Sequence, residues 1–310
     1  MTFWSVRRAA AGDAVQIDDL LRRKAARLEA LDRRLLLPRR AAGRPGLVAV
    51  DGAGTVAGHL RPHLVELTED DEMRSFAAAR VVSWRELAAA SPEALAALVD
   101  AARVPGAADA ALWPAVDGEA PAVFARFAMK PVFVLALRTA GPLPSGPAAT
   151  VRLARPGDLD AVCALHLEEV AFHEPHTPYV RVVPALVPAL RSRLEQLWSG
   201  ADDASTVHVL EVDGVVAGMC ESHVQTVSDE GGQLLPGRYS YLNSVAVGAR
   251  LRGQGFGRTL VSAVIDDVAA RGVDGYTLWF ALDNPLARQV WPRLGFRPLW
   301  ISYERRDLPV

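Results

Sequence analysis

The sequence predicts an α/β protein of the mixed α+β kind, built from two tandem domains of the same plan. The chain has 310 residues, half of them hydrophobic, which is enough for two ordinary cores. Glycine and proline crowd the stretch from Thr139 to Thr150, where no regular element can form. We therefore expect a linker there, between one domain at residues 1–140 and a second at residues 150–310.

Similar short stretches recur in the same order on the two sides of this linker. The four pairs are Val6–Asp13 with Val151–Asp158, Val48–Gly58 with Leu210–Gly218, Leu112–Asp117 with Leu278–Asp283, and Met129–Pro131 with Phe296–Pro298. The period is far longer than the repeats of solenoid proteins, so the pattern indicates duplication of a whole domain.

The first half has a predicted helix that starts without a glycine-rich turn. Ser91 can cap this helix and Pro92 suits its first position, so we expect the helix to begin there. No glycine occurs between Gly58 and Gly106. The two copies therefore differ at the turn that leads into this helix.

The second half has such a turn between a predicted strand and a predicted helix. Tyr241–Val247 alternates as a strand does, and apolar residues recur at helical spacing from Leu260 to Val268. The turn consists of Arg252, Gly253, Gln254, Gly255, Phe256 and Gly257. Glycines let backbone N–H groups converge, and a helix N-terminus behind them can hold phosphate. Arg252 and Arg258 would add positive charge; the alternative is a solvated, flexible loop.

A second signature follows the predicted strand Tyr276–Ala281. Asn284 and Pro285 predict the start of a short helix, and Gly295 predicts its end. A last strand is expected from Leu299 to Tyr303.

Together the two signatures resemble those of the GNAT superfamily of acetyl-CoA-dependent acyltransferases. The pyrophosphate motif of the family is matched by Arg252, Gly255 and Gly257, and its short helix before leucine-glycine-phenylalanine is matched by Leu294–Phe296. The resemblance covers about residues 150–305. It implies two GNAT-like domains, each with a splayed central sheet flanked by helices. The first copy, which lacks the turn, is then expected to be degenerate and structural, docked against the second copy.

The resemblance also implies a place for acetyl-CoA. Backbone groups of Val245, Ala246 and Val247 would pair with its pantetheine arm, and a backbone N–H there would stabilise the oxyanion. Asn284 would bond to the same arm; its other role, as a plain helix cap, is compatible with this. Acetyl-CoA is expected as the co-substrate, and no metal is expected.

One position departs from the family pattern. Many members carry a tyrosine that reprotonates the CoA thiolate, where this chain has Trp291. An indole does not titrate, so Trp291 cannot be a general acid. A thiol pKa near 8.5 still makes the thiolate a tolerable leaving group. We expect slower transfer, or another residue in the role of the acid.

Four polar residues near the predicted cofactor strand are candidates for catalysis and substrate binding, because an acceptor amine must lose a proton before it attacks. Glu221 follows an apolar run on the neighbouring strand and could be a general base acting through water, or simply an outward-facing residue. Asn243 stands where many relatives have an acid, and would orient substrate or water. Tyr241 and His223 are second candidates, with structural roles as the alternative.

The region after the first strand of the second half corresponds to the acceptor wall of GNAT proteins. The expected substrate contacts there are Phe172, His173, Glu174, His176 and Tyr179. This acidic and aromatic mixture suits a cationic amine. His173 and His176 could pass for a metal pair, but prolines interrupt the segment and no further ligands complete a set. Residues 225–238 are expected to form a mobile loop over the same opening.

Composition narrows the classes of function. The formal net charge of −2 shows no excess of basic residues for binding nucleic acid. No apolar run reaches the length of a membrane helix. Met1–Arg8 lacks the apolar core of a signal peptide. Cys163 and Cys220 lie in apolar segments and imply no disulfide framework, so a reducing cytoplasm is expected.

These observations predict a cytoplasmic N-acetyltransferase whose second domain moves an acetyl group from acetyl-CoA to a primary amine, by direct attack in a ternary complex. The acceptor would be a small molecule or a peptide; the sequence fixes neither its identity nor the oligomeric state. One alternative keeps the cofactor but changes the acyl donor, or uses an alcohol or thiol acceptor. Another is a non-catalytic, CoA-binding regulatory module.

Overall fold

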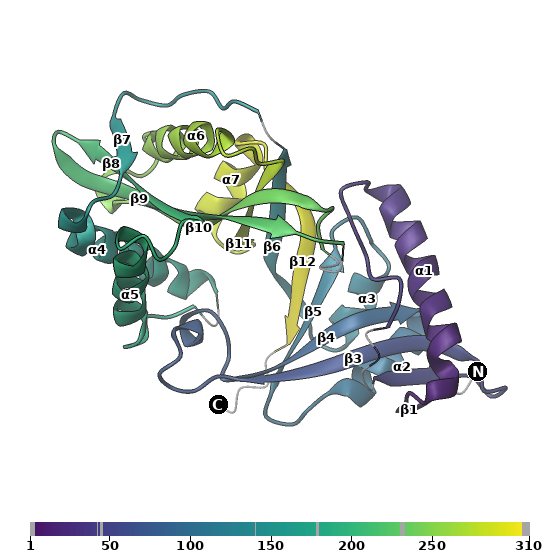
Figure 1. The fold of residues 1–310 in the computed structure, drawn as a ribbon. Coiled ribbons are helices and arrows are strands. Elements are labelled where there is room, and N and C mark those ends of the chain that lie inside the picture. The colour runs from purple at the N-terminus through teal and green to yellow at the C-terminus, as the bar shows by residue number, and fades with distance from the viewer. Residues whose placement is uncertain are drawn as a thin grey trace.

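The computed structural model describes residues 4–41, 43, 46–139, 141–177, 180–229 and 233–305, which form two halves with a similar order of strands and helices (Figure 1). The first half contains β1 (Ser5–Arg8), α1 (Ala14–Leu31), β2 (Leu47–Val50), β3 (Val56–Glu66), η2 (Glu72–Ser75), β4 (Arg80–Ala89), α2 (Pro92–Ala102), β5 (Ala108–Pro114), α3 (Ala120–Arg126) and β6 (Lys130–Thr139). The second half contains β7 (Thr150–Leu153), α4 (Leu159–His173), η4 (Glu174–His176), α5 (Leu186–Trp198), β8 (Ser205–Val212), β9 (Val215–Val227), β10 (Gly237–Val247), η5 (Ala249–Leu251), α6 (Phe256–Ala269), β11 (Gly275–Ala281), α7 (Pro285–Arg293) and β12 (Arg297–Arg305). None of the described helices combines the length and the apolar character needed to cross a bilayer.

The same bidentate ion pair opens both halves. Arg7 donates from its two terminal nitrogens to the Asp13 carboxylate at 2.6 and 2.9 Å, and Arg152 does so to Asp158 at 2.7 and 3.0 Å. The hydrogen bond from Arg7 lowers the pKa of Asp13 to about 2. Each aspartate fixes the turn between the first strand and the first helix of its half, so this pair of sequence landmarks is a true structural repeat.

All twelve strands join one sheet, because the two halves exchange their last strands. The order is β1-β2-β3-β4-β5-β12-β6-β11-β10-β9-β8-β7. β12 pairs with β5 of the first half, β6 pairs with β11 of the second half, and β6 and β12 pair with each other. These two strands run side by side through the middle of the molecule (Figure 1). The splayed sheets predicted for the two halves are therefore continuous.

The exchanged strands carry core residues into the opposite half. Val134 and Ala136 of β6 pack in the core of the second half with Tyr276. Tyr303 of β12 packs in the core of the first half, with its ring centre 5.1 Å from that of Phe124. Each core is thus completed by a strand from the other half.

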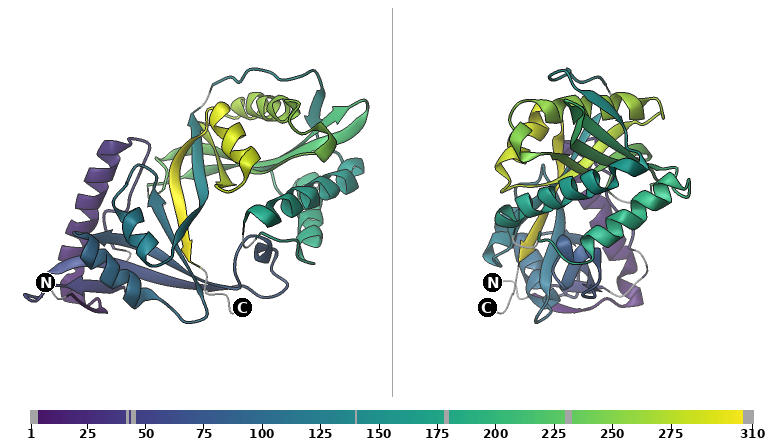
Figure 2. Two further views of the ribbon diagram at one scale, coloured as in Figure 1. Left: turned by 180° about the vertical axis from the view of Figure 1, so that it is seen from behind. Right: turned by 90° about the vertical axis from the view of Figure 1, so that its left-hand side faces the viewer.

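Helices cover both faces of the sheet in each half (Figure 2). In the second half, α4 and α5 lie on one face of β8, β9 and β10, and α6 and α7 lie on the other. In the first half, α1 lies on one face, and α2 and α3 on the other. In each half the first helix therefore lies on the opposite face of the sheet from the last two helices.

The short-range expectations hold, and the loop expected at residues 225–238 is shorter than predicted. Ser91 caps α2 by accepting a hydrogen bond from the Ala94 N–H at 3.2 Å, and Gly295 has a φ of +84° after α7. Residues 225–227 and 237–238 belong instead to the paired ends of β9 and β10. Leu234 is buried in a cluster with Trp300. The other described residues of this segment, 228–229 and 233–236, lie before the beginning of β10, whereas the glycine-rich turn follows its end.

We predict that the second half does not fold alone, because β6 supplies part of its core and a partner for β11. Residues 141–310 expressed alone should be insoluble or lack native near-ultraviolet circular dichroism. Co-expression with residues 1–140 should restore a soluble complex with a single cooperative unfolding transition. A folded monomer of residues 141–310, as stable as the intact chain, would contradict the strand exchange.

Candidate active site

β10 and β11 begin as parallel neighbours and then separate. They pair only over Tyr239–Tyr241 and Gly275–Thr277, although β10 continues to Val247 and β11 to Ala281. The later part of β10 therefore has no strand partner on the β11 side, so its backbone polar groups on that side are open to a ligand. Val245, Ala246 and Val247 lie in this part, as the sequence predicted.

A β-bulge marks the point of separation. Asn243 is an extra residue between Leu242 and Ser244, which face consecutive residues of β9. A bulge bends its strand and increases its twist, which turns β10 away from β11. The side chain of Asn243 is fixed as well, because its Nδ2 donates to Glu221 Oε2 at 2.9 Å.

The glycine-rich turn forms at the end of this open strand. Gly253 and Gly255 have φ values of +77° and +91°, which other residues rarely adopt, and Gly255 is the N-cap of α6. The N–H groups of Gly253, Gly255, Phe256 and Gly257 donate to no acceptor within the described ranges. Gln254 turns back and donates to the Arg250 carbonyl at 2.8 Å. Four free donors at a helix N-terminus make a site for an anion.

The linker between the halves braces this turn. Thr259 Oγ1 donates to the Pro147 carbonyl at 2.8 Å. A Cβ on Gly255 would lie 3.0 Å from Pro147 Cδ, so the linker and the turn are in close contact. At Gly257, by contrast, a Cβ would meet only Val247 Cγ2, at 3.8 Å.

The two arginines of the turn have different surroundings. Arg252 donates to Glu168 Oε1 at 2.7 Å and to the Val247 carbonyl at 3.0 Å, and its guanidinium lies 4.7 Å from the ring centre of Phe172. Its charge is therefore already paired, and it ties the end of β10 to α4. Arg258 is exposed on the first turn of α6 and has no ion-pair partner within the described ranges.

Asn284 caps α7 and also contacts α4. Its Oδ1 accepts the N–H groups of Leu286 and Ala287 at 3.0 and 3.1 Å, which caps α7. Its Nδ2 lies 3.4 Å from His173 Nδ1 at the end of α4. Burial lowers the pKa of His173, although the charge of Glu169 opposes this, so the imidazole accepts from the amide as a neutral group.

Glu221 is a buried carboxylate held from two sides. Besides the hydrogen bond from Asn243, Arg193 of α5 lies with its Nε 3.3 Å from Glu221 Oε1. Arg193 also pairs with Glu72 in η2, which belongs to the first half of the chain. In Figure 1 this segment of the first half lies beside α5. The first half therefore reaches the site of the second through one ion pair.

A second carboxylate, Glu169, lies near the bulge and was missed as a functional candidate. It accepts a hydrogen bond from the hydroxyl of Ser244, and its Oε2 is 3.6 Å from His166 Nδ1. Burial alone would raise the pKa of Glu169, but His166 and Ser244 outweigh it, so this pKa lies below its ordinary value. The spacing of His166, Glu169 and His173 places all three on one face of a helix, which was the available signal.

Tyr241 and His223 lie together on neighbouring strands. They are opposite each other in the register of β9 and β10, and their ring centres are 5.3 Å apart. Burial, together with the charges of Glu169 and Glu221, raises the pKa of Tyr241 to about 12. The phenol is thus protonated at neutral pH and can donate a hydrogen bond.

The expected acceptor wall is only partly at the site. Phe172 packs against His176 with ring centres 5.2 Å apart, next to the guanidinium of Arg252. Glu174 is exposed and accepts the Val182 N–H at 2.8 Å, so it shapes the chain after η4. Tyr179 lies outside the described residues.

Two further positions bear on the chemistry of the site. Trp291 packs edge to face on Phe296, with ring centres 5.4 Å apart, and is a packing residue. In the described part of the chain, no three His, Cys, Asp or Glu side chains gather as metal ligands would.

The comparisons with known proteins agree with this geometry. Residues 166–296 match the model of the Acetyltransferase (GNAT) family. A GCN5-related N-acetyltransferase from Sphaerobacter thermophilus has a similar fold, with a TM-score of 0.53 at 17% identity over 99% of this chain and 96% of that one. A tandem GNAT protein from the clavulanic acid biosynthesis pathway aligns over 99% of this chain and 100% of its own, with 18% identity and a TM-score of 0.47. No curated protein sequence matches the chain.

The second half therefore contains a domain of the GNAT acetyltransferase family, at residues 166–296. Acyl transfer is the class of activity of that family.

At position 284, aspartate should replace asparagine as a helix cap but not as a hydrogen-bond donor. In Asn284→Asp the carboxylate still caps α7 and suits the helix dipole, so the free energy of unfolding should stay within about 0.5 kcal/mol of the original. In Asn284→Ala it should fall by about 1 kcal/mol. Both variants should bind coenzyme A more weakly by calorimetry, because both lose the amide donor. Unchanged affinity in the aspartate variant would reduce Asn284 to a helix cap.

Proposed function

We propose that the protein is an N-acetyltransferase that uses acetyl-CoA, and that its second half carries the reaction. The observation behind this is the junction at the end of β10, where an open strand edge leads into four unpaired N–H groups at the start of α6. The first half has no counterpart to that turn, because α2 starts directly at Pro92 after the cap Ser91.

The residues at this junction suit the two parts of coenzyme A. The free N–H groups of the turn, with Arg258 beside them, are suited to a diphosphate. The backbone groups within Val245–Val247 that face away from β9 are suited to the amide groups of a pantetheine arm, although the Val247 carbonyl already accepts from Arg252. Asn284 offers one more donor. When bound, acetyl-CoA would supply the acetyl group as a reactive thioester.

The groups at the bulge are suited to deprotonate an amine. Glu221 would take the proton through a water molecule, while Asn243 and Arg193 hold its carboxylate in place. Tyr241, protonated at neutral pH, would orient the acceptor as a hydrogen-bond donor. The backbone N–H groups beside the bulge would stabilise negative charge on the carbonyl oxygen.

The charges around the bulge support a cationic amine as the acceptor. Glu169 and Glu221 both lie close enough to Tyr241 of β10 to raise the pKa of its phenol, so two carboxylates and an aromatic ring lie near one another. Carboxylates attract the protonated amine as it enters the site, before it loses its proton. A small-molecule or peptide amine is therefore proposed. Both cysteines are free and buried, which supports a reducing compartment such as the cytoplasm.

Gly257 offers a test of the diphosphate site that leaves the fold intact. A Cβ fits at Gly257, and an acidic side chain is favourable in the first turn of a helix, so Gly257→Glu should fold normally. Its carboxylate would repel the diphosphate, so affinity for coenzyme A should fall at least about 100-fold in calorimetry. Gly257→Ala is the matched control and should bind. Normal affinity in Gly257→Glu would place the diphosphate elsewhere.

Glutamine substitutions distinguish the two carboxylates. Glu221→Gln should lower kcat by a factor of about 10² or more, with coenzyme A affinity unchanged. Glu169→Gln, which keeps a partner for the Ser244 hydroxyl, should lower kcat by less than about tenfold. The opposite order of effects would assign the base to Glu169.

Thiol release from acetyl-CoA across a panel of amines, alcohols and thiols tests the reaction itself. The proposal expects release that depends on an amine, with an acetylated amine seen by mass spectrometry. Coenzyme A binding without any acceptor-dependent release would instead identify a regulatory binding module. Release that depends on an alcohol, a thiol or a different acyl-CoA would identify another acyltransferase of the family.

A further inference from the structure

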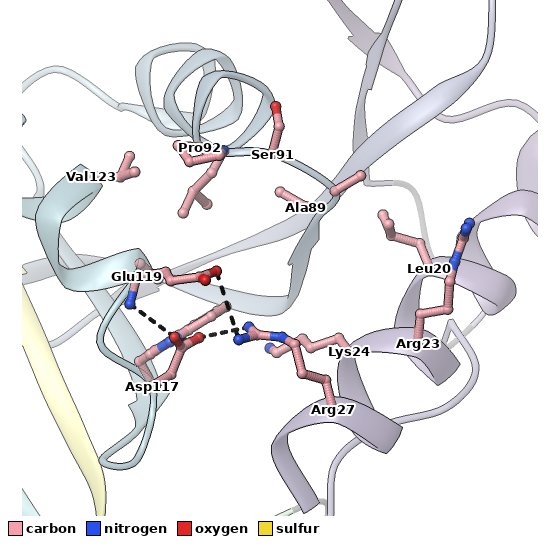
Figure 3. Close-up of a pocket in the computed structure, with 14 residues that line it drawn as sticks. Leu20, Arg23, Lys24, Arg27, Ala89, Ser91, Pro92, Asp117, Glu119 and Val123 are labelled. Carbon is pink, nitrogen blue, oxygen red and sulfur yellow. Dashed lines mark hydrogen bonds and ion pairs between the residues drawn. The ribbon is translucent and has the colours of Figure 1, made fainter. Parts of the chain in front are cut away.

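The first half has a cavity in the place that corresponds to the site of the second half. Its volume is about 330 Å³, and it lies between α1, the end of β4 and the starts of α2 and α3 (Figure 3). β4 pairs with β5 only over Val81–Trp84 and Ala108–Ala111, so these strands also separate beyond that point. The cavity is within the size range of small-molecule sites.

A lysine takes the position in this cavity that Glu169 takes in the second half. Lys24 lies eleven residues after Asp13, and Glu169 lies eleven residues after Asp158, on the equivalent helices α1 and α4. The Lys24 ammonium donates to the Leu87 carbonyl near the end of β4 at 2.5 Å. The lysine therefore occupies the open strand edge from which a pantetheine arm would have to bond.

The three cations that line the cavity, Arg23, Lys24 and Arg27, differ in their ion pairs among the described residues. Arg23 pairs with Asp19 at 2.5 Å, and Arg27 pairs with Asp117 at 2.9 Å and with Glu119 at 3.7 Å. Figure 3 shows Asp117 and Glu119 turned toward Arg27. Lys24 has no ion-pair partner among the described residues.

The other contact of Lys24 is with an aromatic ring. Its ammonium lies 4.0 Å from the ring centre of Trp113. Burial lowers the pKa of Lys24 to about 7, although the charge of Asp117 opposes this. An ammonium has three donors, and one carbonyl uses only one of them. A carboxylate beside Lys24 would supply the missing acceptor and the missing charge.

Part of the remaining wall is apolar. Leu20, Leu95, Trp113 and Val123 line the cavity, and Pro92 contributes no N–H at the start of α2. We propose that this cavity binds a small organic monocarboxylate, with its carboxylate on Lys24 and its apolar body against Trp113 and the aliphatic side chains. This is a ligand site of the first half, separate from the acyl-transfer site.

Pairs of acids and amides of equal shape test the charge requirement. Isovalerate, benzoate, phenylacetate and indole-3-acetate would each be titrated by calorimetry into the intact protein beside the corresponding amide. At least one acid should bind with a Kd of about 1 mM or tighter, and its amide should bind at least about tenfold more weakly. No saturation by any acid up to about 10 mM, or equal binding of acid and amide, would overturn the proposal.

Substitution of the lysine tests its part in the site. Lys24→Met keeps an unbranched side chain of similar length without the charge, and should reduce the affinity for the acid at least about tenfold. Lys130→Met is the matched control, because Lys130 is exposed at the start of β6 and is the other lysine of the chain. Unchanged binding in Lys24→Met would overturn the assignment.

Labelling of the unaltered protein gives an answer even if Lys24→Met fails to fold. Reductive methylation with formaldehyde at pH 7.5, read by mass spectrometry, reports each of the two lysines separately. A bound carboxylate keeps Lys24 protonated and covered, so at ten times its Kd it should slow methylation of Lys24 about tenfold and leave Lys130 unaffected. Equal protection of both lysines, or protection by the amide, would refute the site.

Discussion

The separation of a parallel strand pair beyond a bulge is the constraint on which both halves of this protein depend. In the second half the bulge is Asn243, and the pairing of β10 with β11 ends just before it. In the first half the register of β3 with β4 shifts after His59, and Glu86 in β4 has a φ of +53°. The extra twist at a bulge opens the sheet on one side while the other side stays paired. Each half thereby gains a wedge of unpaired backbone.

The helix over each wedge determines what the wedge can hold. α4 places Glu169 against Ser244, directly beside the bulge of the second half, and leaves the end of β10 free to meet the glycine turn. α1 places Lys24 at the corresponding point, where its ammonium binds the Leu87 carbonyl. The two halves thus carry opposite charges at one equivalent helical position, Glu169 in the second half and Lys24 in the first.

The exchange of β6 and β12 makes the two wedges parts of one rigid sheet. Ala25 and Leu28 of α1 pack in one cluster with Trp300 of β12 and Tyr239 of β10, so the first helix also supports the strand that leads to the active site. Glu72 adds a second connection, because its partner Arg193 reaches Glu221. The first half is therefore a structural part of the proposed acyl-transfer site, although its own turn has no glycines.

Local backbone chemistry allowed the sequence to predict a specific set of features. Ser91 caps its helix, Gly253 and Gly255 take positive φ values, and Asn284 starts α7, because each depends on a few neighbouring residues. The repeat of short stretches in the two halves could be recognised for the same reason, because both copies must form the same turns. The open edge at Val245 was implied only by the family resemblance.

Contacts between residues far apart in the chain could not be predicted from the sequence. The partners of β6 and β12, the Glu169–Ser244 hydrogen bond and the Glu72–Arg193 ion pair each join segments far apart in the chain. The predicted bounds of the loop at residues 225–238 were too wide, because polar and glycine-rich composition does not reveal where a strand ends. Secondary-structure propensities and helix caps depend on a few neighbouring residues, so the sequence alone predicts them. Strand order and the charges around a cleft are decided only when the whole sheet assembles.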